Sequence, residues 1–386
     1  MRVVEYHPQI AFGEHYPPQW ASATPRCPAA GRGARQSASG RSIFIEKGRF
    51  TFDARSGFAL VGKGIGLEPG DRVLLPAYHC RSMVEPFRWL GCDVDFYRVR
   101  ADLSVDPEDL ARRIAPRTRL AVLVDYFGFE HANEEAISLC RDAGIALVKD
   151  CAHRLMLPAL PDEFVAGVAS LPKFLPVREG GAIVAADPAL LEGPSVDASP
   201  GRALRTLISV YRAQRAATRQ SQLNGAWGEP VTALDPDLLP SPDSLDRQPE
   251  PEEYRYFNAA RFESGVSVVT ARIVRSQDLE QVARRRRECY RAVADAVAEN
   301  PSLQPLFDGL PDAITPYVFP VVLPDAVRQF ELLHHNGIGI LRWEDMAVSD
   351  CPISTAYRLS LVQIPCHQEL TDLQLERLVE VVGTIR

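Results

Sequence analysis

IALVKDCAH (Ile145–His153), followed by SLPKFLPVREGG (Ser170–Gly181), is the part of the sequence that decides the fold. The apolar run of the first segment is typical of a buried strand, and an aspartate, Asp150, ends it. Lys173 follows 23 residues later. The paired glycines that close the second segment predict a tight turn beside the loop that carries this lysine.

The pattern around these segments is typical of an α/β fold. From about Phe52 to Asp187, short apolar runs alternate with amphipathic stretches, which indicates βαβ units and a mainly parallel sheet. An amphipathic helix is predicted over 131–144, and an antiparallel hairpin is predicted to close the sheet. The remaining predicted strands and the two hairpin strands are Arg72–Cys80, Asp93–Val99, Leu120–Gly128, Val165–Leu171 and Gly180–Asp187.

The C-terminal part predicts a smaller α+β domain. We divide the chain into an N-terminal segment (1–40), a large α/β domain (41–250) with an insertion at about 188–250, and a small domain (251–386). The elements expected after residue 187 are a basic helix over Arg202–Arg219, one long helix over Val268–Asn300, strands at Tyr317–Leu323, Gly339–Trp343 and Tyr357–Val362, and a last helix after Thr371.

Composition excludes several classes of protein. A net charge of -7 argues against a nucleic-acid binder, whose phosphate-contacting surface would make the balance basic. No apolar run approaches the length of a membrane helix, and no signal pattern opens the sequence, so we expect a cytoplasmic protein. The eight cysteines form no CxxC pair and the histidines show no ligand spacing, so neither disulfides nor a metal site are expected.

Asp150 and Lys173 suit a pyridine-ring cofactor. A carboxylate at a strand end can hydrogen-bond a ring nitrogen and keep it protonated, which makes the ring an electron sink. A lysine can form an imine (Schiff base) with an aldehyde and act as the base that moves a Cα proton. Taken singly, each residue is more often a helix cap or a solvated side chain, but together they indicate pyridoxal 5'-phosphate (PLP).

Four segments in the right order resemble the DegT-like (DegT/DnrJ/StrS) sugar aminotransferases. The segments are GDRVLLPAYH (Gly70–His79), LVKDCAHR (Leu147–Arg154), the Lys173 to Gly181 spacing, and IPCHQELTDLQL (Ile364–Leu375). The resemblance implies the PLP-dependent transferase fold of type I, with a mostly parallel seven-stranded sheet. It also implies a homodimer whose active site lies at the subunit interface, where Asn258 or Arg261 would enter the neighbouring site; a plain interdomain linker is the alternative for these two.

Carried over by position, the resemblance assigns Asp150 to the pyridine nitrogen and His153 to the neighbourhood of the phenolic oxygen. Ser56 and Gly57 are the nearest match to the segment that holds the phosphate. His79-Cys80 stands where the family has a threonine and a stacking aromatic residue, so His79 or Tyr78 is expected to contact the ring.

The segment before Lys173 differs from the family, and a basic run lies later in the chain. Val168 stands where the family has a serine, five residues before the lysine, so we expect that this phosphate contact is either lost or moved to Ser170. Arg284–Arg287 is expected to be the solvated face of the long helix.

The resemblance implies an aminotransferase that moves an amino group from an amino-acid donor, with glutamate expected, to a keto group of a nucleotide-linked sugar. One alternative is a PLP enzyme without net transamination, such as a dehydratase, but the relatives of that kind carry histidine in place of the lysine. The other alternative is a non-catalytic relative that binds PLP or a sugar as a regulator.

Overall fold

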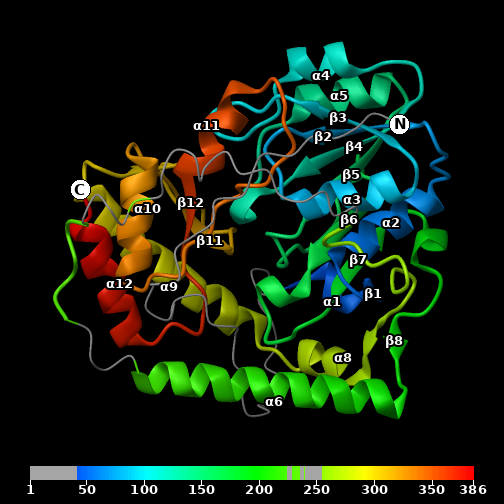
Figure 1. Ribbon diagram of the computed structural model, residues 1–386. Helices are drawn as coiled ribbons and strands as arrows, with labels where there is room; N and C mark the ends of the chain where they lie inside the picture. Colours follow the sequence, from blue (N-terminus) through cyan, green and yellow to red (C-terminus); the bar gives the residue numbers. More distant parts are fainter. Residues whose placement is uncertain (1–40, 224–227, 235–238, 240–253) are drawn as a thin grey trace.

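The computed structural model describes residues 41–223, 228–234, 239 and 254–386 (Figure 1). The predicted N-terminal segment, 1–40, and positions 224–227, 235–238 and 240–250 of the predicted insertion lie outside the described residues. Among the described residues, no helix is long and apolar enough to cross a membrane, and no group of His, Cys, Asp and Glu side chains could hold a metal ion.

A seven-stranded sheet in the order β1-β7-β6-β5-β4-β2-β3 forms the centre of the fold. The strands from β6 to β3 run parallel, whereas β7 is antiparallel to β6 and β1 is antiparallel to β7. The predicted α/β fold with a mostly parallel sheet is therefore confirmed, as is the predicted hairpin. The strands are β1 (Arg49–Thr51), β2 (Arg72–Pro76), β3 (Asp93–Tyr97), β4 (Thr118–Val124), β5 (Ala146–Cys151), β6 (Ala166–Ser170) and β7 (Gly181–Ala185).

Helices lie on both sides of this sheet (Figure 1). The helix α2 (Ala54–Gly64) packs beside α3 (Arg81–Trp89), and α4 (Pro107–Arg113) packs beside α5 (Glu134–Asp142). Asp53 caps α2, since its side chain accepts a hydrogen bond from the amide of Ser56. This cap fixes the start of α2 directly after β1, close to the carboxyl ends of the parallel strands. The short helix α1 (Ile43–Glu46) precedes β1.

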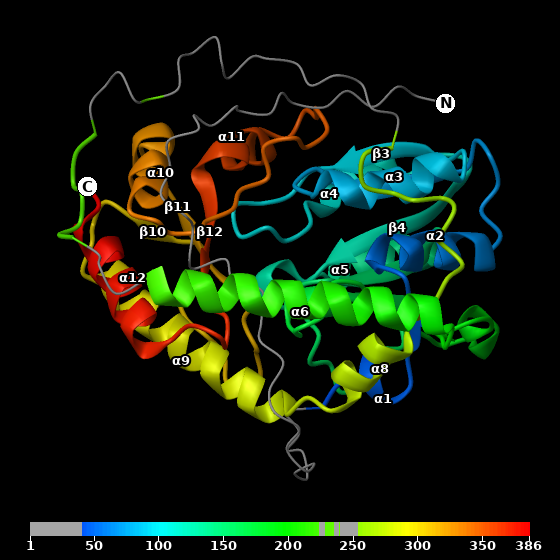
Figure 2. The same ribbon diagram turned by 60° about the horizontal axis from the view of Figure 1, so that its bottom comes forward.

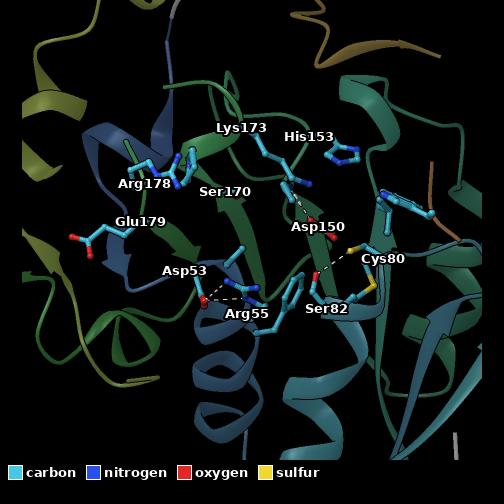
Figure 3. Close-up of a pocket in the computed structure, with 18 residues that line it drawn as sticks. Asp53, Arg55, Cys80, Ser82, Asp150, His153, Ser170, Lys173, Arg178 and Glu179 are labelled. Carbon is cyan, nitrogen blue, oxygen red and sulfur yellow. Dashed lines mark hydrogen bonds and ion pairs between the residues drawn. The ribbon is translucent and has the colours of Figure 1, made fainter. Parts of the chain in front are cut away.

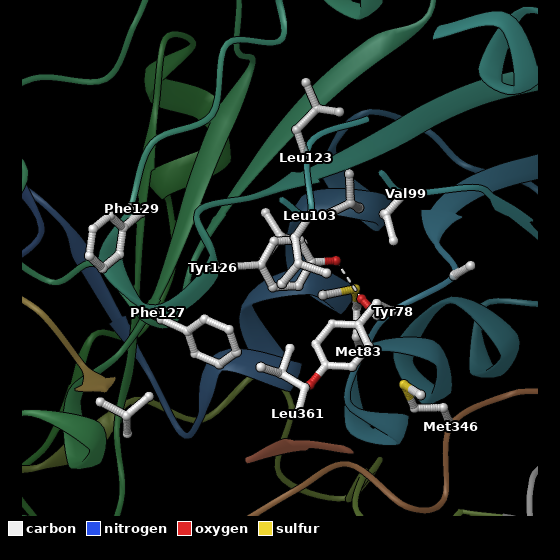
Figure 4. Packing of buried hydrophobic residues seen from close by; sticks show 14 of the residues in the cluster. Tyr78, Met83, Val99, Leu103, Leu123, Tyr126, Phe127, Phe129, Met346 and Leu361 are labelled. Atoms are coloured by element: carbon white, nitrogen blue, oxygen red, sulfur yellow. Dashed lines mark hydrogen bonds between the residues drawn. The ribbon is translucent and has the colours of Figure 1, made fainter. Parts of the chain in front are cut away.

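An aromatic cluster in the core holds the loops that follow β2 and β4 (Figure 4). The ring centroids of Tyr78 and Tyr126 are 5.8 Å apart, and the Tyr126 hydroxyl donates a hydrogen bond to the carbonyl of Tyr78. The Tyr78 ring also lies 4.8 Å from that of Trp343, in the C-terminal part of the chain. These buried aromatic contacts join the two parts of the molecule beside the strand ends.

The C-terminal part contains a three-stranded antiparallel sheet in the order β10-β11-β12, which confirms the expected α+β arrangement. Its strands are β10 (Gln304–Pro305), β11 (Val318–Val322) and β12 (Leu361–Pro365), and its helices are α9 (Leu279–Ala298), α10 (Ala326–His335), α11 (Pro352–Ser360) and α12 (Asp372–Thr384). The side chains of Thr371 and Gln374 form a capping box at the start of α12, the predicted last helix.

Three predictions for this part were wrong in detail. Gly339–Trp343 forms only a single bridge, between Leu341 and Gln363. The run packs as a loop, with Ile340 buried and Leu341 exposed. Residues Tyr357–Ser360 end α11, and the strand begins at Leu361. The expected long helix is broken into α8 (Val268–Arg275) and α9, because the Asp278 side chain caps the amide of Gln281 and starts a new helix.

The basic helix predicted for Arg202–Arg219 is confirmed as α6 (Pro200–Leu223), which runs along the outside of the molecule (Figure 2). It follows β8 (Val196–Asp197), which pairs in parallel with β9 (Val266–Ser267). These short strands place Val196–Asp197 of the predicted insertion beside Val266–Ser267 of the predicted small domain.

Candidate active site

A cavity of about 320 Å³ lies where β4, β5 and β6 end, with α2 and α3 beginning beside it (Figure 3). This carboxyl edge of the parallel strands is the usual ligand site in open α/β sheets. The cavity is lined by Asp53, Ala54, Arg55, Phe58, Cys80, Ser82, Met83, Val124, Asp150, Ala152, His153, Ser170, Pro172, Lys173, Arg178, Glu179, Gly180 and Trp343.

Asp150 lies near the end of β5 and is 5% exposed. Burial raises the pKa of its carboxyl to about 6, although the backbone amide of Ala152 and the charge of Lys173 act in the opposite direction. That amide donates to Oδ1 at 2.7 Å, and Oδ2 accepts no hydrogen bond from the other described residues. The second oxygen is therefore free to accept a hydrogen bond from a ligand in the cavity.

Lys173 ends a short 3-10 turn that follows β6. Burial lowers the pKa of its amine, an effect that the charge of Arg55 reinforces and that Cys80 and Asp150 oppose. Its Nζ lies 5.2 Å from the ring centroid of Tyr317 and makes no hydrogen bond or ion pair within the described part of the chain. A buried amine of lowered pKa and without such partners is suited to act as a nucleophile and as a base.

The two glycines after the lysine loop are required by geometry. Gly180 has φ +125°, a conformation that side chains disfavour. A Cβ at Gly181 would lie 2.4 Å from the carbonyl carbon of Asp53, so only glycine lets β7 approach the start of α2. The predicted turn therefore also places the beginning of α2 beside the lysine loop.

His153 is buried between two aromatic rings, those of Phe127 and Tyr317, with centroid distances of 5.5 and 4.5 Å. Burial lowers its pKa well below the usual value, and the charge of Lys173 acts in the same direction. The amide of Phe127 donates to Nδ1 at 3.1 Å, so the neutral ring carries its hydrogen on Nε2. Since His153 lines the cavity, this N–H is the ring's donor for a ligand oxygen.

The structure brings together four of the predicted site residues in this one cavity: Lys173, Asp150, His153 and Ser170. Three others do not line it: Ser56, Gly57 and His79. Arg261, predicted to enter the neighbouring subunit's site, lies within this chain over the ring of Phe52, with 5.2 Å between its guanidinium carbon and the ring centroid.

His79 serves the core instead of the cavity. Its Nδ1 lies 3.0 Å from the carbonyl oxygen of Pro76, its Nε2 accepts the amide of Ala347, and its ring stacks on that of Phe96 at 4.8 Å. Tyr78, the other residue expected to contact the ring, is also fully buried outside the cavity lining. Of the pair His79-Cys80, it is Cys80 that reaches the cavity.

The two residues predicted to hold the phosphate, Ser56 and Gly57, make other contacts. The amide and the hydroxyl of Ser56 both donate to Oδ1 of Asp53, at 2.8 Å each. Gly57 packs against β6, where a Cβ at this position would lie 2.9 Å from Cγ1 of Val168.

Sequence reasoning missed several cavity residues. Arg55 directly precedes the predicted Ser56, so adjacency was a usable signal for it. Trp343 enters from the distant C-terminal part, and no local pattern could have indicated it. The other missed polar or thiol residues of the lining are Asp53, Cys80, Ser82, Arg178 and Glu179.

Arg286 corrects the expectation of a solvated basic run. It is 1% exposed, and its guanidinium donates to the carbonyls of Lys173 (2.9 Å) and Tyr317 (2.8 Å) and to Oε1 of Gln368 (2.8 Å). Its carbon lies 4.5 Å from the ring centroid of Phe174. Arg286 therefore ties α9 to the lysine loop and to β11, and it fixes the backbone from which the Lys173 side chain extends.

We expect Arg286→Ala to destabilise the protein by about 3 to 5 kcal/mol, because it leaves buried carbonyls without their donor. Arg284→Ala, two positions away on the exposed face of α9, is the matched control and should change stability by less than about 0.5 kcal/mol. Urea unfolding of both variants measures the difference. Equal losses of stability in the two variants would show that Arg286 does not stabilise the loop that carries Lys173.

Glu179 binds the lysine loop to the later part of the chain. Its Oε1 accepts the amide of Ser267 (2.8 Å) and the hydroxyl of Thr270 (3.1 Å), and its Oε2 pairs with Arg202 of α6 at 2.9 Å. Both oxygens of Glu179 are therefore bonded to other residues of the chain. Asp150, in contrast, is a lining carboxylate with one oxygen free to bind a ligand.

The lining groups fit PLP. The free Oδ2 of buried Asp150 suits a protonated ring nitrogen, the amine of Lys173 suits an aldehyde, and Nε2–H of His153 suits a phenolic oxygen. The seven-stranded sheet and this arrangement at its carboxyl edge define the PLP-dependent transferase fold of type I.

Residues 55–205 match the model of the DegT/DnrJ/EryC1/StrS aminotransferase family. The resemblance found in the sequence is thereby confirmed over these residues, where the chain is similar to this family.

Known proteins are similar to this chain at low identity. The chain is 26% identical over 155 residues to Protein MosB of Rhizobium meliloti, a match that covers 38% of this chain and about a third (31%) of MosB. Its fold is similar to that of the aminotransferase TlmJ from Streptoalloteichus hindustanus, with a TM-score of 0.62, 19% identity and 91% of each chain covered. For Helicobacter pylori PseC, an aminotransferase involved in the biosynthesis of pseudoaminic acid, the TM-score is 0.63 and the identity 15%, over 94% of this chain and 98% of PseC.

Proposed function

We propose that this protein is a PLP-dependent aminotransferase that transfers an amino group from an amino-acid donor, glutamate, to a keto group of a nucleotide-linked sugar. The observation that carries the proposal is the convergence of Lys173, Asp150 and His153 on one cavity. The family match and the similarity to PseC support an acceptor of the sugar class.

The cofactor, when bound, supplies an electron-withdrawing ring that stabilises negative charge on the Cα of the amine being processed. Asp150 binds the ring nitrogen and holds a proton there, since a carboxylate favours the charged form of a hydrogen-bonded base. His153 remains neutral because of its burial and donates Nε2–H to the phenolic oxygen.

Lys173 attaches the cofactor and moves the proton. The lowered pKa increases the neutral fraction of its amine, which is the form that attacks a carbonyl and accepts a proton. Nζ of Lys173 would accept the Cα proton of the donor. Arg286 holds the backbone of this residue at its carbonyl, so the base works from a fixed position.

Borohydride trapping tests the proposal. We expect the purified chain, incubated with PLP and reduced, to carry one pyridoxyl phosphate group, and peptide mass spectrometry should locate it on Lys173. A protein that stays colourless with PLP and unlabelled after reduction would refute the proposed function. Reduction without added PLP is the control for cofactor retained during purification.

A donor and acceptor screen tests the substrate class. With glutamate as donor, the 2-oxoglutarate produced is measured, and keto sugars with and without a linked nucleotide are compared as acceptors. Amination of simple keto acids alone would contradict the proposed acceptor.

A further inference from the structure

The constitution of PLP determines where its phosphate must lie. The aldehyde carbon is para to the ring nitrogen, and its two neighbouring carbons carry the phenolic oxygen and the phosphate arm. With the nitrogen at Asp150, the aldehyde at Lys173 and the phenolic oxygen at His153, the phosphate arm points to the side of the cavity away from His153. Figure 3 shows the side chains of Asp53, Arg55, Ser170 and Arg178 on that side.

Neutral hydroxyl contacts are scarce on this side. The Ser56 hydroxyl is bonded to Asp53, and Gly57 and Val168 pack against each other without a polar atom between them. Ser170 is the hydroxyl that lines this part of the cavity. A doubly charged phosphate is bound most strongly where a charged donor supplements the neutral ones, which favours a cationic group on this side.

Arg55 meets this requirement. Its Nε and Nη2 donate to Oδ2 of Asp53, at 2.9 and 2.6 Å, which holds the guanidinium at the first turn of α2. Its Nη1 makes no hydrogen bond with other residues in the described ranges, and the side chain is 32% exposed. The N–H donors on this edge of the guanidinium are therefore available to a ligand in the cavity that Arg55 lines. A guanidinium edge binds phosphate oxygens in a bidentate manner.

Arg178 is placed differently. It is exposed, and it also lines a second hollow formed against α6 by Arg205, Ile208, Ser209, Arg212 and Ala213. No acidic partner among the described residues orients it as Asp53 orients Arg55. It therefore serves as the comparison residue on the same side of the cavity.

We propose that the Arg55 guanidinium, oriented by Asp53, binds the phosphate group of the cofactor. This inference rests on the proposed function, because it takes the positions of the ring nitrogen, aldehyde and phenolic oxygen from it. It assigns Arg55 the phosphate contact that the sequence led us to expect from Ser56 and Gly57.

The test compares PLP with pyridoxal, which has the same ring and aldehyde but lacks the phosphate. Dissociation constants of both are measured by absorbance titration of the full chain for wild type, Arg55→Gln and Arg178→Gln. We expect Arg55→Gln to weaken PLP binding by at least about tenfold, the value of a charged hydrogen bond, and to change pyridoxal binding by less than about twofold. Arg178→Gln should leave the ratio of the two constants at the wild-type value.

The outcomes separate this inference from the proposed function. A wild-type chain that binds neither compound refutes the proposed function itself. A wild-type chain that prefers PLP, together with an Arg55→Gln variant whose preference is unchanged, refutes only the role of Arg55. A preference lost with Arg178→Gln instead would assign the phosphate to that residue and overturn the inference.

Arg55→Lys guards against a folding defect. Lysine keeps the positive charge but lacks the planar guanidinium with its paired N–H donors. Arg55→Lys should therefore recover part of the preference for PLP over pyridoxal. If Arg55→Gln instead weakens the binding of pyridoxal as much as that of PLP, the substitution disturbs the whole cavity, and the assignment of the phosphate to Arg55 is overturned.

Discussion

Replacing Lys173 by alanine is expected to abolish the covalent attachment of PLP and to slow transamination by at least about 1,000-fold, because attachment and proton transfer are lost together. Folding should survive, since Nζ has no hydrogen bond or ion pair with other described residues and its burial disfavours its own charge. The absorbance band of the bound cofactor and the rate of 2-oxoglutarate formation measure the two effects. A variant that keeps both would show that another group holds the cofactor.

A second buried lysine gives the matched control. Lys149 lies on β5, beside Asp150 in sequence, and its Nζ pairs with Asp125 at 2.9 Å and Glu130 at 3.3 Å. Although burial lowers the pKa of Lys149, these carboxylates outweigh it and raise the pKa above its usual value. A lysine held in the charged form is a poor nucleophile, so Lys149→Met should still be labelled on Lys173 after reduction. Labelling of Lys149 in wild type would contradict the assignment.

The sheet was predictable because each of its buried strands is a local pattern. Apolar runs such as Val73–Leu75 and Leu120–Val124 identify parallel strands from a few consecutive residues. The grouping of Asp150 and Lys173 in one site was predictable for a related reason. Asp150 lies near the end of one strand and Lys173 just after the next, and the carboxyl ends of parallel strands meet at one edge of a sheet.

The missed features depend on contacts between distant residues. Arg286 looked like part of a solvated basic run, and only the approach of the lysine loop and β11 to α9 shows that it is buried. Trp343 reaches the cavity, and Tyr317 contacts the amine of Lys173, from the C-terminal part, more than a hundred residues after Lys173. The break between α8 and α9 was locally readable, since Asp278 is a good capping residue, but the apolar periodicity continued across it.

Asp150→Asn is expected to reduce transamination by at least about 100-fold, the scale of a well-placed proton-transfer group. The amide of asparagine can still accept the hydrogen bond from Ala152, so the local backbone should be unchanged. It cannot stabilise a positively charged ring nitrogen, however, and the ring then withdraws fewer electrons. Asp53→Asn, which alters the other end of the cavity and retains a capping residue, is the control for a general effect of a lost carboxylate. It should affect PLP binding more than the rate of proton transfer.

The same substitution is expected to stabilise the protein without cofactor. The pKa of Asp150 rises from 3.8 to about 6 on folding, so above pH 6 the folded chain carries a buried charge that the unfolded chain exposes. By linkage, this costs about 3 kcal/mol at pH 7 and is relieved as the pH falls from 6 toward 4, where the folded state binds the extra proton. Asp150→Asn should therefore raise the melting temperature at pH 7 but have little effect at pH 4. Thermal unfolding of the cofactor-free protein at both pH values measures the sign of this effect. A variant less stable than wild type at pH 7 would mean that the Asp150 carboxylate supports the fold. A gain in stability together with a loss of turnover is what we expect for a residue that is retained for its chemistry.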